Sequence, residues 1–374
     1  MKLLYISNAR IPTEKAHGIH IVKMCEVFAQ AAEVELIIPM RFNKIKESPF
    51  KYYGINPNFK IKKLFCFDLI PLDRYLGYSA LWLESLSFTM SVFFYLLFKK
   101  SDIIYTRDKS LLFISPFRKN FIFETHTFPK NYFLYSSFFK RLKGIIVITQ
   151  KLKEAFIEKR IAEDKILTAP DGVDIEMFDI RVSMQEAREK LGLPQDKKIM
   201  LYTGHLYSWK GVDVLTEASR YLPENAEVYL VGGTKEDIEK LKIKNYKLKI
   251  NVVGHRPYSE IPLWLKAADV LVLPNSGKEE ISRHWTSPLK MFEYMAAAKP
   301  IVASDLPSIR EVLNEENAVL VEPDNPIALA KAIEEILKNS KLSDKISKKA
   351  YMDVAENYTW RKRRRKIFRF FNLQ

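Results

Sequence analysis

The stretch from Thr286 to Pro307, TSPLKMFEYMAAAKPIVASDLP, combines a loop, a helix and a short apolar strand in an order that suits phosphate binding. Ser287 suits the N-cap of the helix and Pro288 its first position. A helix N-terminus offers unpaired N–H groups and a partial positive charge, which together bind anions. Glu293 lies one to two turns further on, where its carboxylate could accept hydrogen bonds from a ribose diol. Spacing alone favours the simpler interpretation, an ordinary helix–strand unit with Glu293 on a solvated face.

A second loop with phosphate-binding chemistry follows the apolar strand predicted at residues 198–204. This loop carries Lys210 between glycines, and a lysine after a strand can meet a diphosphate as a point charge. The signal is weak by itself. Two strand-to-helix loops of one sheet can point at the same phosphate group, so Lys210 and the Ser287 loop together predict one convergent site.

A histidine ends a third apolar segment, residues 121–126, which reads FIFETH. Ligands of open α/β sheets bind beyond the carboxyl ends of the strands. A histidine at that place can hydrogen-bond a sugar hydroxyl or take part in a proton transfer. A lone histidine is more often structural, so spacing leaves both interpretations of His126 open.

A glycine lies in the loop that is predicted after the first strand, residues 2–7. The backbone of Gly18 could approach a diphosphate closely, or Gly18 could serve only as a loop residue with permissive dihedral angles. His17 and His20 are interpreted as polar loop residues. A helix is expected from about residue 21 to residue 32.

The letters of the first motif are more specific than their spacing. The sequence SPLKMFEYM resembles the donor-nucleotide motif of retaining glycosyltransferases of the GT-B fold, family four. That family usually carries two glutamates separated by seven residues; Glu293 matches the second, and Trp285 stands in the place of the first. Glu279 or Glu280 could substitute for the missing glutamate.

The lysine loop resembles the G-R-L-x-x-x-K-G motif of the same family. Gly204, Lys210 and Gly211 match this motif, and His205 stands where arginine is usual. The replacement removes one fixed positive charge, so the resemblance implies that stabilisation of the diphosphate relies more on Lys210.

The resemblance extends to the other candidates. It implies that His126 contacts the donor sugar near the reacting carbon and that Gly18 faces the donor. It also implies that the nucleotide base lies near His255 and Arg256. Asp171 occupies the place of an asparagine that lies beside the interdomain linker in the family.

The function implied is transfer of a sugar from a nucleotide-sugar donor, a UDP- or GDP-sugar, to a hydroxyl of a glycan or lipid-linked glycan, with retention of configuration. No cofactor is expected, and the lack of an Asp-x-Asp motif argues against a metal-bound diphosphate. The expected catalytic residues are His126, Lys210 and Glu293. The expected donor-binding residues are Gly18, Gly204, His205, Arg256, Ser287, Pro288, Leu289, Lys290 and Glu293.

The alternation of predicted strands and helices along the 374 residues indicates an α/β protein. The fold that the resemblance implies is GT-B, with two Rossmann-like, doubly wound domains facing a cleft. We expect an N-terminal acceptor-side domain at residues 1–178 and a donor-binding domain at 179–355. A basic helix at 356–374 is expected to cross back to the first domain.

The net charge of +15 indicates an anionic partner, which could be nucleic acid, lipid or substrate. The tail YTWRKRRRKIFRFF and the aromatic segment 42–67 favour an anionic membrane surface. No nucleic-acid motif is present, so nucleic acid is not expected as a partner. A nucleotide-sugar epimerase of the same fold and a basic binding protein remain as alternative functions.

Two further features concern the cellular location. Cys25 and Cys66 match no metal motif and fit a reducing compartment, and the N-terminus shows no signal-peptide pattern. The uncharged run at residues 85–98 is short for a membrane span and is expected to form a buried core helix through Leu86, Met90, Phe93, Phe94 and Leu97. The expected location is cytoplasmic, peripheral on the inner face of the membrane.

Overall fold

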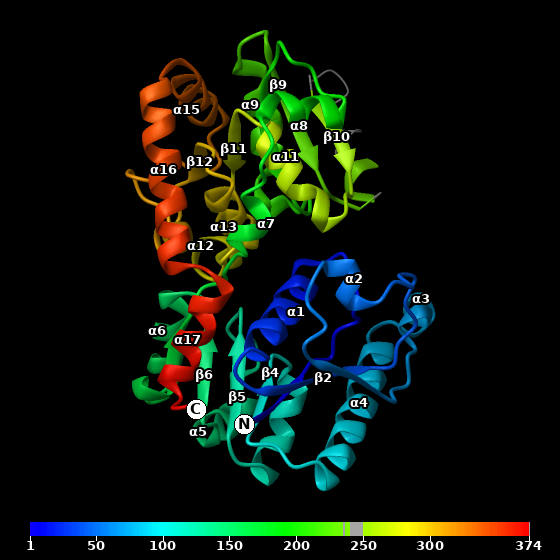
Figure 1. The fold of residues 1–374 in the computed structure, drawn as a ribbon. Helices are drawn as coiled ribbons and strands as arrows, with labels where there is room; N and C mark the ends of the chain where they lie inside the picture. The colour runs from blue at the N-terminus through cyan, green and yellow to red at the C-terminus, as the bar shows by residue number, and fades with distance from the viewer. Residues whose placement is uncertain (235, 240–249, 374) are drawn as a thin grey trace. The chain divides into compact units, whose positions relative to one another are not determined.

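The computed structural model describes residues 1–234, 236–239 and 250–373, and the chain divides into two units (Figure 1). The first unit is Met1–Ala169 together with the tail from Trp360, and the second is Pro170–Thr359. The division precedes the expected residue 178 because the segment after Pro170 packs into the second unit. There the Val173 N–H donates to the Tyr358 carbonyl at 2.9 Å, and Phe178 is buried.

The described part of the first unit contains a seven-stranded parallel sheet in the order β3-β2-β1-β4-β5-β6-β7. Leu3 in β1 is aligned with Val34 in β2 on one side and with Ile103 in β4 on the other. The strand order therefore reverses between β1 and β4, as in a doubly wound sheet. The strands are β1 (Lys2–Ile6), β2 (Glu33–Pro39), β3 (Lys60–Leu64), β4 (Ile103–Thr106), β5 (Phe121–Thr125), β6 (Gly144–Val147) and β7 (Ile166–Thr168).

Right-handed crossovers place the helices on the two faces of this sheet. The connection from β1 to β2 runs in one direction, and those from β3 to β7 run in the other, so α1 covers one face and α4, η2, α5 and α6 cover the opposite one. The C-terminal helix α17 packs on α1, where Phe28 and Phe368 stack at 5.5 Å. The α-helices are α1 (Ala16–Phe28), α2 (Pro49–Tyr53), α3 (Asp73–Leu76), α4 (Tyr78–Phe98), α5 (Tyr132–Arg141), α6 (Gln150–Glu158) and α17 (Trp360–Phe370); η1 (Ile70–Leu72), η2 (Lys109–Phe117) and η3 (Glu163–Lys165) are 3-10 helices.

The second unit repeats this architecture with a parallel sheet in the order β10-β9-β8-β11-β12-β13, which reverses between β8 and β11. The two sheets confirm the predicted α/β class with two doubly wound domains. The strands are β8 (Lys198–Thr203), β9 (Ala226–Val231), β10 (Ile250–Gly254), β11 (Val270–Leu273), β12 (Ile301–Ser304) and β13 (Val319–Val321). The helices are α7 (Ile175–Phe178), α8 (Met184–Leu191), η4 (Ser208–Lys210), α9 (Val212–Ala218), η5 (Ser219–Tyr221), η6 (Tyr258–Glu260), α11 (Ile261–Ala267), α12 (Glu280–His284), α13 (Leu289–Ala296), α14 (Pro307–Arg310), α15 (Pro326–Lys338) and α16 (Ser340–Asn357).

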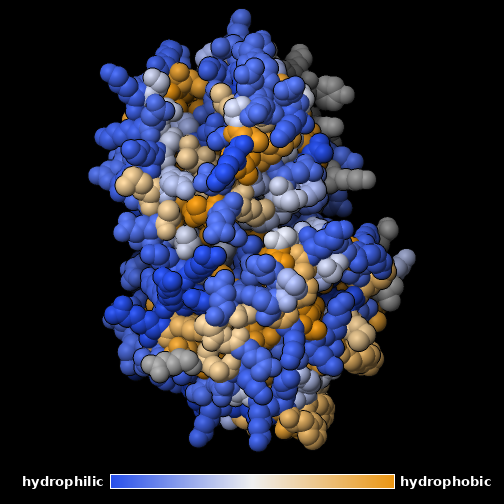
Figure 2. Space-filling model, viewed as in Figure 1, coloured by the Kyte–Doolittle hydropathy of each residue, from blue (hydrophilic) through white to orange (hydrophobic). Residues whose placement is uncertain are grey.

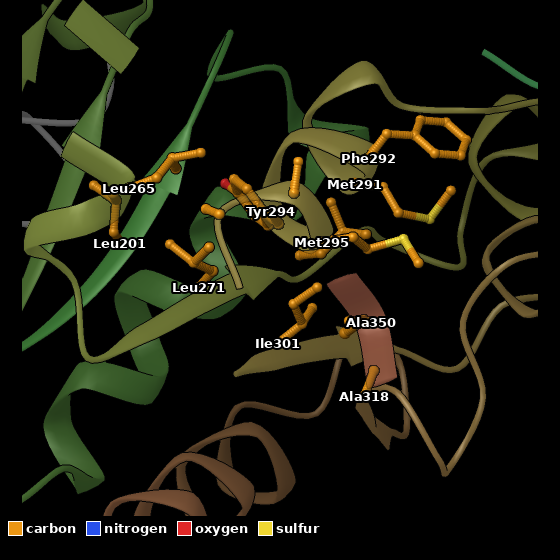
Figure 3. Close-up of a cluster of buried hydrophobic side chains, with 14 of the residues drawn as sticks. Leu201, Leu265, Leu271, Met291, Phe292, Tyr294, Met295, Ile301, Ala318 and Ala350 are labelled. Atoms are coloured by element: carbon orange, nitrogen blue, oxygen red, sulfur yellow. The ribbon is translucent and has the colours of Figure 1, made fainter. Parts of the chain in front are cut away.

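The core of the second unit fixes the position of α13. Successive strand side chains point to opposite faces of a sheet, so Leu201 belongs to one buried cluster and Met200 to the other. Met291 and Met295 of α13 pack into the cluster that contains Leu201 (Figure 3). The burial of this apolar stripe holds α13 against the sheet and thereby determines where its polar residues lie.

Helix α4 differs from the expectation. It is apolar around its whole circumference, so periodicity could not show which side faces the core. The buried stripe is Ala80, Glu84, Phe88, Val92 and Leu96. Four of the residues expected in the core lie on the opposite, exposed side, and these are Leu86, Met90, Phe94 and Leu97.

Leu96 and Leu97 provide a matched pair that tests the orientation of α4. Leu96 is buried and Leu97 is exposed, so Leu96→Ala should lower the free energy of unfolding by about 2–5 kcal/mol through lost burial and a cavity. Leu97→Ala should change it by about 0.5 kcal/mol or less. Denaturant unfolding of the two variants measures both values. Equal losses, or a larger loss for Leu97→Ala, would show that the helix is turned the other way.

Candidate functional site

In the second unit, polar loops meet at the carboxyl ends of β8 and β11, where the strand order reverses. Open α/β sheets bind their ligands at such a point. Gly211 allows the two loops to approach each other: its φ is +69°, and a Cβ at this position would clash with the carbonyl of Pro274. Only glycine fits here, and Lys210 is thereby held over the end of β11.

Lys290 is the most unusual group at this point. Its side chain is 7% exposed, and its Nζ lies 3.5 Å from the centre of the Tyr202 ring. No residue in the described parts of the chain accepts a hydrogen bond from this Nζ. Burial lowers the pKa of Lys290 well below its ordinary value, and the nearby charge of Lys210 lowers it further. A buried ammonium without an acceptor is costly, which indicates that the position suits an anion.

Lys210 and Glu293 lie beside Lys290. Burial lowers the pKa of Lys210 to about 8, although Glu293 partly opposes this shift. Burial raises the pKa of Glu293 to about 7, and the hydroxyl of Tyr258, 3.0 Å from its Oε1, opposes that shift together with the two lysines. The structure therefore brings Lys210, Lys290 and Glu293 together, and the charges of Lys210 and Glu293 respond to pH near neutrality.

The start of α13 differs from the prediction in detail. The helix begins at Leu289, with Pro288 at the N-cap position, so Ser287 does not cap it. The Ser287 hydroxyl instead accepts a hydrogen bond from the Asp171 N–H at 3.1 Å. Pro288 has an extended backbone (φ −70°, ψ 125°) and leads the chain into the helix, and it has no N–H of its own to offer. The first N–H groups that α13 can offer to a ligand are those of Leu289 and Lys290.

Gly204 and His205, in the loop after β8, contribute to the shape of this site. Gly204 follows β8 with a φ of +116°, and a Cβ there would lie 3.9 Å from the Nζ of Lys290. His205 stacks on Tyr207 with ring centres 5.1 Å apart, and its carbonyl accepts a hydrogen bond from the Tyr202 hydroxyl at 2.6 Å. The backbone of His205 thus fixes the ring on which Lys290 rests.

Other predicted residues lie apart from the lysines. Arg256 is exposed after β10, and none of the contacts among the described residues joins it to Lys210 or Lys290. Glu280 forms an exposed ion pair with Arg283 at 2.7 Å, and Glu279 is exposed at the start of α12. Trp285 directly follows this helix, so the prediction that Glu279 or Glu280 replaces the missing glutamate gains no support from their positions.

The first unit contains a separate cluster around Glu124, which is completely buried. The Nε2 atoms of His20 and His126 each lie 2.8 Å from its Oε1, and Nη2 of Arg363 lies 3.2 Å from the same oxygen. The Tyr105 hydroxyl donates to the other carboxylate oxygen. Burial alone would raise the pKa of Glu124, but Arg363, His20 and the histidine hydrogen bonds hold it well below its usual range.

Sequence reasoning predicted a role for His126 within a Glu-x-His arrangement but gave no role to Glu124 itself. Glu124 and His126 are two residues apart, a spacing that places two strand residues on the same face, and this signal could have identified Glu124. His20 was interpreted as a loop residue, whereas it is buried in α1. Arg363 comes from α17, 239 residues away along the chain, and no local pattern could connect it to Glu124.

Gly18 lies in helix α1 and not in the predicted loop. Helix α1 begins at Ala16, so His17, Gly18 and His20 belong to its first turns and not to a loop. A Cβ at Gly18 would clash with the Tyr53 hydroxyl, which accepts from the Thr13 N–H at 2.7 Å. Close packing against Tyr53 therefore requires a glycine here, and the approach of its backbone to a diphosphate stays a prediction.

Comparison with known proteins found a family model that matches the second unit. The family model Glycosyl transferases group 1 matches residues 183–353, which lie in the second unit. This match covers slightly less than half of the chain and shows that the second unit is similar to the group 1 glycosyltransferases. Its fold is that of HepE from Anabaena, with a TM-score of 0.78 at 17% identity over 100% of both chains. This likeness shows the shared GT-B fold.

Two relatives come from Methanocaldococcus jannaschii, and both are uncharacterized glycosyltransferases. One is 28% identical over 58% of this chain and 56% of its own length, so the match spans about half of that relative. The other is 23% identical over 86% of this chain and 83% of its own length.

The Glu124 cluster predicts a pH-dependent contribution to stability. Glu124→Gln leaves Arg363 buried without its counter-charge and should cost about 3–5 kcal/mol at neutral pH. Because the pKa of Glu124 in the folded protein lies below its ordinary value of 4.5, the carboxylate stabilises the fold above pH 4.5. This contribution is lost as the pH falls toward the folded-state pKa, so the two proteins should converge in acid.

Chemical denaturation of both proteins at a series of pH values measures the difference. Glu47→Gln is the matched control, because Glu47 pairs with Lys51 at 3.0 Å on the surface of the same unit. Its loss should cost less than about 1 kcal/mol. A Glu124→Gln variant as stable as the wild type, or a gap that stays constant into acid, would contradict the charge pairing.

Proposed function

We propose that this protein transfers a sugar from a UDP-sugar to a hydroxyl of an acceptor. The observation that carries the proposal is the buried ammonium of Lys290, which has no hydrogen-bond acceptor among the described residues and lies beside Lys210 at the end of β8. Two ammonium groups at a strand-order reversal suit the diphosphate of a nucleotide. The family match of this same unit supports the reaction class.

The proposed mechanism is electrostatic. As the bond between sugar and diphosphate breaks, negative charge develops on the leaving diphosphate. The ammonium groups of Lys210 and Lys290 and the first N–H groups of α13 would stabilise this charge. The site supplies positive charge from side chains, so the proposal includes no metal and no cofactor.

Glu293 of the second unit and His126 of the first unit have separate proposed roles. Glu293 would accept hydrogen bonds from the ribose hydroxyls, and Tyr258 orients its carboxylate. His126 would contact the transferred sugar, and Glu124 fixes the ring through the 2.8 Å contact. Retention of configuration and a glycan or lipid-linked acceptor rest on the sequence resemblance.

The choice of UDP rests on a structural relative. HepE from Anabaena has been solved in complex with UDP and with UDP-glucose. Because that protein is 17% identical to this chain, the nucleotide remains a proposal for the present site, with GDP as the alternative that the experiment must separate.

A nucleotide panel tests the donor site. UDP at 100 times its dissociation constant should raise the free energy of unfolding by about 2.7 kcal/mol, and GDP and ADP should give smaller shifts. Lys290→Met should abolish the shift. The same variant should leave the ligand-free protein as stable as the wild type or stabilise it by about 1–3 kcal/mol, because it removes an unsatisfied buried group.

Thermal melts with and without nucleotide measure both effects. Lys278→Met is the control, because Lys278 is an exposed lysine of the loop between β11 and α12. This variant should bind UDP like the wild type. If Lys290→Met bound UDP normally, or if it lost stability as a structural lysine would, the lysine would not serve the donor.

The pKa of Lys210 predicts how UDP affinity depends on pH. In the ligand-free protein this pKa is about 8, and a diphosphate binds the protonated ammonium. Affinity should therefore fall as the pH rises through 8, by up to about ten-fold per pH unit for one proton. Titration calorimetry between about pH 7.5 and 9.5 measures this slope in a range where Glu293, with its pKa of about 7, is mostly ionised.

Lys210→Met should bind UDP more weakly at pH 7.5 and lose most of this slope. A wild-type affinity that is constant over the range, or a slope that persists in the variant, would assign the pH dependence to another group.

A further inference from the structure

The outer face of α4 exposes a continuous apolar stripe. We define the α4 face by Trp82, Leu86, Met90, Phe94, Phe98 and the neighbouring Phe117 of η2. Trp82 is 77% exposed and Phe98 is 89% exposed. By length and composition α4 could cross a membrane, yet only 22% of its most apolar window is buried. Figure 2 shows apolar side chains at the surface over the region that Figure 1 labels α4.

The surface continues from α4 onto the next two elements. Phe93 of α4 contacts Phe117 at a ring distance of 5.6 Å, and Phe113 of η2 contacts Phe138 of α5 at 5.2 Å. All three elements cover the same face of the sheet, because each follows a strand in the same crossover direction. Their C-terminal ends lie at one edge, where β4, β5 and β6 begin.

The three elements end with the same chemistry. At the C-terminal end of each element an aromatic residue is followed by two basic residues. The sequences are FKK at 98–100 for α4, FRK at 117–119 for η2 and FKR at 139–141 for α5. Phe139 is buried in the core, whereas Phe98 and Phe117 are exposed. The basic residues Lys100, Lys119, Lys140 and Arg141 are also exposed.

The acidic residues of this region offset only part of that charge. Residues 75–143 contain ten Lys and Arg and four Asp and Glu. Glu84 and Glu124 are buried, and Asp108 accepts a hydrogen bond from the Asn8 N–H. Asp102 is exposed at this edge and accepts from the Lys2 N–H at 2.7 Å, and Glu35 of β2 pairs with Lys99 at 2.7 Å. Lys100, Lys119, Lys140 and Arg141 still outnumber these acidic residues. The exposed charge along this edge is therefore mainly positive.

We infer that the α4 face and its basic edge dock the protein on an anionic phospholipid bilayer. Exposed aromatic and aliphatic side chains suit the boundary between headgroups and acyl chains, and lysine and arginine suit lipid phosphates. The carboxyl ends of the strands, where ligands bind, lie at the opposite edge of the sheet. Docking through this edge therefore leaves the carboxyl ends of the strands uncovered, where the partly exposed His126 of the first unit lies.

This inference moves the membrane contact away from the basic tail. The tail residue Arg363 is buried against Glu124, and Arg364 donates to the Val27 carbonyl at 3.1 Å. These two charges stabilise the fold of the first unit and do not face lipid. The exposed tail residues Arg365 and Arg369 remain as the rival contact, and the experiment compares the two surfaces.

The test is flotation of the full chain, without nucleotide, with vesicles of phosphatidylcholine alone or with added phosphatidylglycerol. The wild type should bind only the anionic vesicles, and binding should weaken as salt rises. Phe98→Glu with Phe117→Glu should raise the lipid concentration for half binding about ten-fold or more. Ile327→Glu with Met352→Glu, two exposed positions in α15 and α16, is the matched control and should bind like the wild type.

A tail variant completes the comparison. Arg365→Glu with Arg369→Glu should bind nearly as well as the wild type. Loss of binding in this variant, with normal binding by the Phe98→Glu, Phe117→Glu variant, would overturn the inference in favour of the tail. Failure of the wild type to bind anionic vesicles at low salt would also overturn it, as would a homodimer that the phenylalanine variant dissolves.

A single introduced tryptophan tests the docking face without adding charge, so a folding defect of the glutamate variants cannot explain the result. Because Trp82 lies on the α4 face, both reporters are built in a Trp82→Phe background. There the fluorescence added by Phe98→Trp should be quenched by brominated phospholipids on binding, and the fluorescence added by Ile327→Trp should not. Absence of quenching at residue 98 in vesicle-bound protein would contradict the docking face. Because no nucleotide is present, failure of UDP binding and failure of vesicle binding are separate outcomes.

Discussion

A charged group that is removed from water must find a counter-charge, and this constraint shapes both units of the protein. In the second unit the packing of Met291 and Met295 fixes the position of α13 against the sheet. Lys290 lies on the same helix and is therefore buried as well. Its ammonium has no hydrogen-bond acceptor among the described residues. The apolar core thus holds the proposed anion site in place, at a cost to the ligand-free protein that a bound diphosphate would offset.

The first unit meets the same constraint with a counter-charge from its own chain. Glu124 is completely buried, and Arg363 from the C-terminal helix pairs with it at 3.2 Å. The same carboxylate holds His126 and His20. The tail therefore contributes directly to the position of the histidine that the reaction is proposed to use, and its basic residues are partly structural.

Much of the fold could be predicted from the sequence, because buried parallel strands give apolar runs and the loops between them are rich in glycine. Lys210, Lys290 and Glu293, which gather in the second unit, were also predicted, since each lies in a short motif. The pairing of Glu124 with Arg363 could not be predicted, because it joins distant segments. The orientation of α4 was predicted wrongly, because a helix that is apolar on all sides has no periodic signal.

The central claim is that Lys210 and Lys290 bind the diphosphate of a nucleotide-sugar donor. A crystal structure of the protein with UDP tests it most directly. The account predicts diphosphate oxygens within about 3 Å of the Nζ atoms of both lysines, with the ribose hydroxyls against Glu293. UDP bound elsewhere, or a diphosphate that leaves the Lys290 ammonium without an acceptor, would contradict it.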